Sequence, residues 1–218
     1  MKGLLPFLFA ISLVACGWPT AGFAKADLQY TVRGYGAVSD YAFVNMNQPE
    51  FGLAFRVKNS LHEYLALHTR VAAKNDDPNG GAAGVLSVYV GDNLIHTHVA
   101  TLPVSVGLYA GYQHLWYGSL YNNGLGGGLR LQTRIKRVAL TGKIGSLYGL
   151  SGTIGWHLAC AGNDFVFYGR AAYPITSRLS VFAFLRQERY VGDGNSLTAR
   201  DAGLGLTSTF HYSEPRRD

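Results

Sequence analysis

Apolar and polar residues alternate one by one through most of this chain. Between 51 and 58, for example, Phe51, Leu53 and Phe55 alternate with small or basic residues such as Gly52 and Arg56. Successive side chains of a β-strand point to opposite faces, so this pattern predicts strands with one apolar face. The clearest runs of this kind are 28–38, 51–58, 125–135 and 202–212.

Further strand-like runs fill most of the remaining chain. They are 61–73, 82–90, 94–101, 104–116, 138–148, 151–160, 163–173 and 178–190. Turn-forming residues separate many of them, as in Gly91-Asp92-Asn93 and 192–195. About twelve segments result, many of them long enough for a tilted strand to cross a bilayer. The pattern predicts an all-β, closed, antiparallel up-and-down barrel of 8–12 strands, with twelve as the best estimate.

The segment 61–73 fits two structures. Ser60 and Glu63 have the spacing of a helix capping box, and Leu61, Tyr64 and Leu65 follow at helical spacing. The same stretch also alternates in the manner of a strand. We favour a strand because the neighbouring segments need a partner there, and a helix would lower the strand count.

The first 26 residues have the features of a signal peptide. Lys2 precedes an apolar stretch over 4–15, and Ala24-Lys25-Ala26 offers small residues at the positions a signal peptidase reads. Cleavage there would leave a barrel domain of 27–218. A second interpretation remains open, because Leu13-Val14-Ala15-Cys16 has the form of a lipoprotein box with Cys16 as the lipidated residue.

The distribution of charged and aromatic residues favours a membrane barrel over a soluble one. Beyond residue 26 no stretch approaches the roughly 18 apolar residues of a transmembrane helix, so a membrane would be crossed by strands. Basic residues lie opposite the apolar faces near strand middles, as an aqueous lumen would allow. Aromatic residues gather at segment ends, as interface girdles require: Trp116, Tyr117, Tyr121, Tyr148, Tyr173, Tyr190 and Tyr212. We therefore expect the protein in the bacterial outer membrane, surrounded by outer-membrane lipid.

The last hairpin, 173–212, resembles the closing hairpin of small outer-membrane barrels such as the opacity and OmpA-like proteins. In that family a short periplasmic turn leads into a long strand, an outer loop and a terminal strand. The resemblance implies that the barrel-insertion machinery reads the terminal strand, which ends in Phe210 and Tyr212. Residues 213–218 depart from the pattern by continuing past this aromatic end.

The inward-facing charged residues are the main functional clue. Most are basic, and they are Arg33, Arg56, Arg70, Arg130, Arg134, Lys143 and Arg186, with Glu188 as a partner of Arg186. One interpretation is a narrow, anion-favouring pore for small anionic solutes. The other is a structural barrel, filled by networks of Arg with Glu and Tyr. The few acids on these faces favour the pore.

Other motifs give weaker hypotheses. His96 and His98 share a strand face, as two metal ligands would, but no further ligand pair is near in sequence. His211 and Ser213 are similar to the His-x-Ser of lipid A deacylases, which leaves a lipid-modifying enzyme as one alternative and a surface-binding adhesin barrel as another. Removing Lys2 and Lys25 from the net charge of +6 leaves +4, which does not indicate nucleic-acid binding. We expect no catalytic residues and no cofactor.

Overall fold

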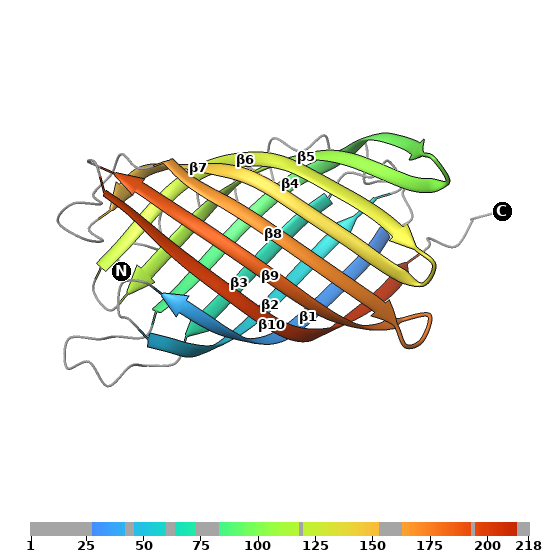
Figure 1. Cartoon of the computed structure of the whole chain (residues 1–218), viewed down its shortest axis with the longest axis horizontal. Helices are drawn as coiled ribbons and strands as arrows, with labels where there is room; N and C mark the ends of the chain where they lie inside the picture. Colours follow the sequence, from blue (N-terminus) through green and yellow to red (C-terminus); the bar gives the residue numbers. More distant parts are fainter. Residues whose placement is uncertain are drawn as a thin grey trace.

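Ten antiparallel strands within the described residues form a closed barrel (Figure 1). The computed structural model describes residues 28–41, 46–59, 64–72, 83–117, 120–152, 163–192 and 195–212. Each strand pairs with its sequence neighbours, and β1 pairs with β10 to close the wall. The strands are β1 (Leu28–Tyr41), β2 (Met46–Lys58), β3 (Tyr64–Ala72), β4 (Ala83–Val99), β5 (Leu102–Tyr117), β6 (Leu120–Ile135), β7 (Val138–Gly152), β8 (Asn163–Pro174), β9 (Leu179–Gly192) and β10 (Asn195–Tyr212). The prediction of an all-β, up-and-down barrel is confirmed.

The strand number lies within the expected 8–12, but the best estimate of twelve is wrong. Gly91-Asp92-Asn93 is not a turn: the runs 82–90 and 94–101 form the single strand β4, which changes register between Asn93 and Ile95. A β-bulge of this kind bends a strand without ending it. The run 151–160 is not a separate strand in the described chain, since β7 ends at Gly152 and 153–162 lie outside the described residues.

The ambiguous segment 61–73 contributes a strand. Tyr64–Ala72 form β3, which pairs with β2 on one side and β4 on the other. The barrel wall therefore satisfies the backbone of this segment, which outweighs its local helical spacing. The signal-peptide and lipidation predictions, including Cys16, fall on 1–27, outside the described residues. No helix in the described part of the chain is long and apolar enough to cross a membrane.

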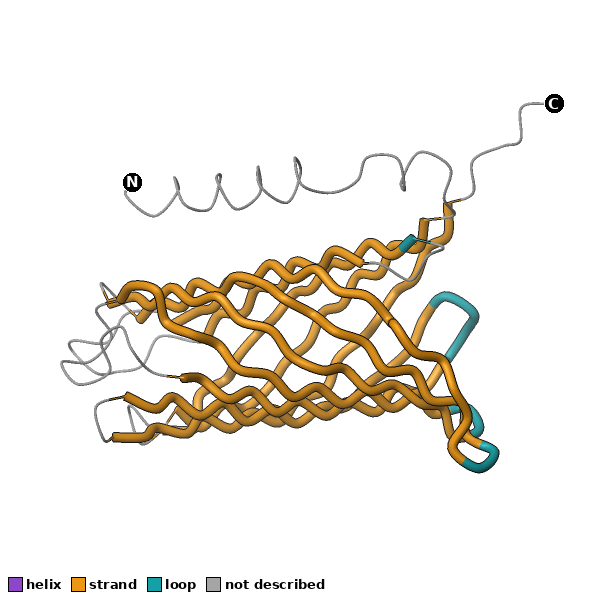
Figure 2. Tube along the Cα trace, turned by 90° about the horizontal axis from the view of Figure 1, so that it is seen from above, coloured by secondary structure: helices purple, strands orange, loops and turns teal. Residues whose placement is uncertain are grey.

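The described turns lie together at one end of the barrel, which we call the turn end (Figure 2). They join β4 to β5, β6 to β7 and β8 to β9. Ala100 and Lys136 begin the first two of these turns with positive φ, of 56° and 53°. The opposite end, where most connections lie outside the described residues, is called the loop end. The β4–β5 hairpin projects furthest from the turn end (Figure 1).

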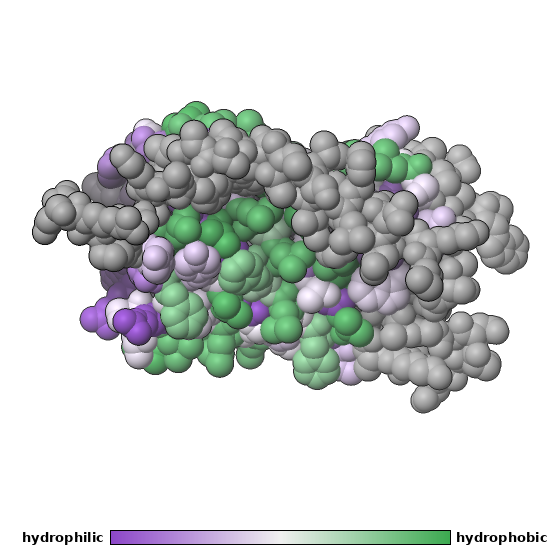
Figure 3. Space-filling model, turned by 180° about the vertical axis from the view of Figure 1, so that it is seen from behind, coloured by the Kyte–Doolittle hydropathy of each residue, from purple (hydrophilic) through white to green (hydrophobic). Residues whose placement is uncertain are grey.

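The outer wall is apolar. Large hydrophobic side chains such as Leu129, Leu185 and Leu204 are exposed on it, and apolar residues cover much of the visible wall in Figure 3. Aromatic residues lie near both ends, with Tyr121 and Tyr148 towards the loop end and Tyr173 and Tyr212 at the turn end. This placement matches the aromatic girdles of membrane barrels.

Aromatic side chains fill part of the barrel interior. Phe182 and Phe184 of β9 are buried with Ala37 and Ala172, and the ring of Tyr35 packs edge-on against Phe184. Tyr35 also covers Gly52 of the paired strand, where an added Cβ would lie 2.0 Å from its ring. Only glycine permits this close approach. The lumen is therefore partly occluded on the side of β8, β9 and β1.

Candidate functional site in the barrel interior

Five buried charged residues form a network across the loop-end half of the lumen. This ionic network consists of Glu50 on β2, Arg70 on β3, Arg186 and Glu188 on β9, and Asp201 on β10. Each faces inward because it follows the period-two alternation of its strand. Barrel closure brings β3 opposite β9 and β10, so residues more than a hundred positions apart meet.

The two arginines of the ionic network bind all three carboxylates. Arg70 donates to Glu188 and to Asp201, the latter at 3.1 Å, while Arg186 donates to Asp201 and, at 2.8 Å, to Glu50. Glu50 and Arg70 have exposed side-chain fractions of 0% and 1%. Buried charges require such pairing, because an unpaired one loses its hydration without compensation. These ion pairs compensate the buried charges of the network, which extends across the loop-end half of the lumen.

A second group of charges lies nearer the turn end and is entirely basic. This basic cluster consists of Arg33 on β1, Arg56 on β2, Arg130 on β6, Lys143 on β7 and Arg170 on β8. Its members are close enough for each to experience the positive charge of others: Arg33 interacts with Arg56, Arg130 and Arg170, and Lys143 with all four arginines. Five positive charges from five strands thus meet inside one narrow barrel.

Uncharged aromatic rings contact several cations of the basic cluster. The guanidinium of Arg130 lies 4.7 Å from the ring centre of Tyr64, and that of Arg56 lies 5.8 Å from the same ring. Lys143 Nζ lies 5.4–5.8 Å from the rings of Tyr89, Tyr109 and Tyr168. Cation–π contacts of this kind stabilise a cation by about 0.5–2 kcal/mol, but they do not neutralise its charge.

Among the described residues, no carboxylate forms an ion pair with the basic cluster; the ion pairs found involve Arg70 and Arg186. Arg130 donates a hydrogen bond to Gln132, and Arg170 donates one to Thr141 at 3.5 Å. These acceptors are neutral. Within the described residues, the charges of the loop-end half are therefore paired, whereas the five cations of the basic cluster have no ion pair.

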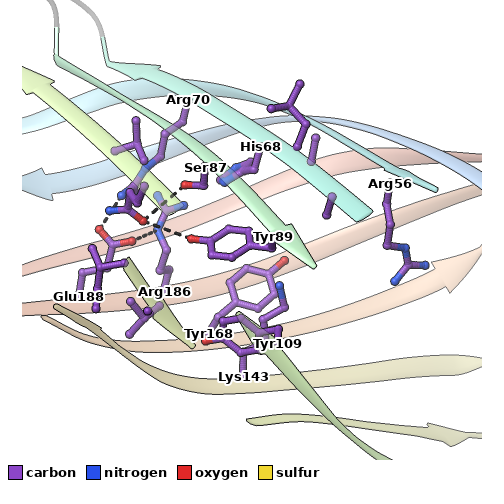
Figure 4. A pocket seen from close by; sticks show the side chains of 18 of the residues that line it. Arg56, His68, Arg70, Ser87, Tyr89, Tyr109, Lys143, Tyr168, Arg186 and Glu188 are labelled. Carbon is purple, nitrogen blue, oxygen red and sulfur yellow. Dashed lines mark hydrogen bonds and ion pairs between the residues drawn. The ribbon is translucent and has the colours of Figure 1, made fainter. Parts of the chain in front are cut away.

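A cavity of about 130 Å³ lies between the two halves. Arg33, Arg56 and Lys143 line it on the basic side. Arg70, Arg186 and Glu188 line it on the side of the ionic network (Figure 4). Tyr89, Tyr109 and Tyr168 form part of its wall. Since about 10–15 Å³ of such space holds one water molecule, the cavity has room for several waters or a small solute.

The structure separates the predicted lumen residues into these two groups. Arg33, Arg56, Arg130 and Lys143 belong to the basic cluster, whereas Arg70, Arg186 and Glu188 belong to the ionic network. Arg134 follows the inward alternation of β6 but lies exposed near the turn end, and it joins neither group.

Three charged residues of the interior are not among those predicted from the sequence. Arg170 lies on the same face of β8 as Tyr168 and Ala172, so the period-two alternation of this strand alone could have identified it as an inward residue. Glu50 lies two residues before Gly52 on the inward face of β2, and Asp201 precedes Gly203 on β10. Both acids lie beyond the clearest alternating runs. The loop-end half therefore contains more inward acids than the sequence pattern indicated.

The other candidate motifs form no site in the described residues. His96 and His98 lie exposed on the projecting hairpin, where His96 Nδ1 is 2.8 Å from Ser105 Oγ. No group of three or more His, Cys, Asp or Glu side chains with metal-binding geometry occurs in the part of the chain that the structure describes. His211 is exposed at the end of β10, and Ser213 lies outside the described residues.

No protein-family model matches the chain, and no curated protein sequence matches it either. Many solved structures share its fold. The outer-membrane protease OmpT from Escherichia coli is 12% identical, with a TM-score of 0.50, over 85% of this chain and 96% of that one. The N-terminal β-barrel domain of Pseudomonas aeruginosa OprF is 11% identical, with a TM-score of 0.41, over 85% of this chain and all of that domain.

Outer-membrane phospholipase A from Escherichia coli is another match, 12% identical, with a TM-score of 0.36, over 84% of this chain and 92% of that one. At such identities the likeness concerns the fold alone. The fold is that of bacterial outer-membrane β-barrels. Its apolar outer wall and aromatic girdles agree with the expected location in the outer membrane.

Proposed function

We propose that this outer-membrane barrel is a narrow pore whose lumen favours anions. The observation that carries the proposal is the basic cluster, five inward cations without an ion pair to any described carboxylate. A ring or cluster of Arg and Lys in a lumen lowers the energy of an anion there and raises that of a cation. An interior that serves only to fill the barrel would gain from pairing these charges, as the ionic network does.

The ionic network and the aromatic filling keep the passage narrow. Arg70 crosses the lumen to Glu188 and Asp201, and Phe182 and Phe184 occupy space on the side of β9. Ten strands enclose a lumen between the filled interior of an eight-stranded barrel and the water channel of large porins. We therefore expect a small conductance with intermittent opening rather than the steady current of a wide porin.

Current measurements across a planar lipid bilayer test this proposal. With a KCl gradient, the reversal potential of the wild-type channel should have the sign of chloride selectivity. The double variant Arg33→Gln/Arg56→Gln should shift that potential towards zero, because it removes two of the five positive charges of the basic cluster.

The matched control is Arg137→Gln, which removes a charge from the exposed turn between β6 and β7. Its reversal potential should stay close to that of the wild type, since an exposed charge is screened by salt. A folded wild-type protein that forms no channel, or one that selects for potassium, would contradict the proposal.

A further inference from the structure

The basic cluster has hydrogen-bond donors that lack acceptors. The Nε atoms of Arg33, Arg56, Arg130 and Arg170 are buried without a hydrogen-bond partner, and so is Nη1 of Arg170. Arginine has only donors, so these groups require acceptors from elsewhere. A buried polar group without an acceptor costs about 1–3 kcal/mol, so these donors require water or an anion as their acceptors.

The side chains that carry these donors point into the barrel interior. Arg130 is 3% exposed and is held over the ring of Tyr64. Arg33 and Arg56 reach the wall of the 130 Å³ cavity, and Lys143 lies in the same wall among three tyrosine rings (Figure 4). The cavity thus offers positive charge and N–H donors in a space of small-solute size.

From these observations we infer that the cavity binds a small oxyanion of the sulfate and phosphate class, held by Arg33, Arg56 and Lys143. This inference rests on the proposed function, because it names the class of anion that the lumen takes. Four tetrahedral oxygens can accept several N–H donors at once, and the guanidinium fork matches two such oxygens. Two negative charges offset more of the five positive charges than one does.

The alternatives fit the site less well. A chloride ion carries one charge and lacks the separated oxygens that the arginine forks match. A large polyanion would exceed the cavity, which the ionic network closes on one side and tyrosines enclose on another. The carboxylate of Glu188 also lines the cavity, so we expect the anion nearer Arg33 and Lys143, away from that negative charge.

Calorimetric titration of the full-length, folded protein in zwitterionic detergent tests the inference directly. Sodium sulfate and sodium phosphate should each give a saturable isotherm with about one site per chain. Sodium chloride and sodium nitrate at matched ionic strength should not. Saturable chloride binding as tight as that of sulfate would overturn the inference.

Two variants locate the site. Arg33→Gln/Arg56→Gln should weaken sulfate binding about tenfold or more, because it removes both guanidiniums on the basic side of the cavity. Lys143→Gln should also weaken sulfate binding. This single variant tests the site if the double variant does not fold. Arg137→Gln should bind as the wild type does. Unchanged sulfate binding in a folded cavity variant would also overturn the inference.

Titration and current measurement together separate the two proposals. An anion-selective channel without saturable sulfate binding would refute the oxyanion site and leave the pore proposal standing. Sulfate binding that the cavity variants weaken, in a protein that forms no channel, would refute the pore and support the site. Sulfate binding together with chloride selectivity would support both.

Discussion

Among single residues, Arg70 has the largest structural role in the lumen. It is almost completely buried, and it contacts all three carboxylates of the ionic network. Removing it would leave three buried acids with Arg186 as their remaining arginine. Removing one side of a buried ion pair is far more damaging than replacing the whole pair, because the remaining charge stays unpaired.

We expect Arg70→Met to lower the free energy of unfolding by about 3–5 kcal/mol. Urea titration of the protein in phospholipid vesicles, followed by tryptophan fluorescence, measures this change. Arg189→Gln, an exposed charge on β9, is the matched control and should change stability by less than about 0.5 kcal/mol. Equal stability of the Arg70 variant and the wild type would show that the ionic network does not hold the barrel together.

Among the secondary-structure elements, the β4–β5 hairpin differs from the rest of the wall. The pairing of β4 with β3 ends at Gly91, whereas its pairing with β5 continues to Val99. Within the described residues, the turn-end part of β4 therefore has a free edge. Alternate amides of 95–99 point away from β5 and lack a strand partner.

Hydrogen–deuterium exchange should reveal this edge. We expect the outward-pointing amides of 95–99 to exchange about ten times faster or more than those of 85–90, which have a strand on each side. Residues 104–111 of β5, which pair with both β4 and β6, provide the internal reference. Equal protection of 95–99 and 85–90 would contradict a free edge.

Across the molecule as a whole, the distribution of polarity is the reverse of that in a soluble barrel. Charged residues lie inside, and large apolar residues lie on the wall, where Leu204 is 67% exposed. In water such a wall would be a large apolar patch prone to association. In a bilayer the same wall is solvated by lipid, so the membrane is the environment in which this fold is stable.

A charge placed on the wall should therefore cost most near the middle of a strand. We expect Leu204→Arg, near the centre of β10, to destabilise the vesicle-embedded barrel by about 2–4 kcal/mol. Val99→Arg, at the tip of the projecting hairpin, should cost about 0–1 kcal/mol, since it lies near or beyond the interface. Urea titration of both variants gives the comparison, and equal effects would argue against a bilayer-spanning wall.

Alternation in the sequence is enough to specify most of the strands and the polar face of each. It is a local property of the extended backbone, so the pattern assigns Arg33, Arg56 and Lys143 to the face opposite the apolar one, which is the lumen face in a membrane barrel. The same local pattern does not fix the strand number. A bulge within β4 and a turn between two strands look alike in sequence, because both contain Gly and Asn.

The partners of the inward charges, in contrast, depend on the tertiary fold. Alternation places Arg70 and Arg130 on the same kind of face, yet one lies among three carboxylates and the other over Tyr64. The difference arises from barrel closure, which sets β3 opposite β9 and β10 and brings Arg70 to Asp201 across 131 residues of sequence. The period of a strand specifies which of its side chains face the lumen and which face the lipid. Barrel closure and strand register specify which side chains of other strands they meet across the lumen.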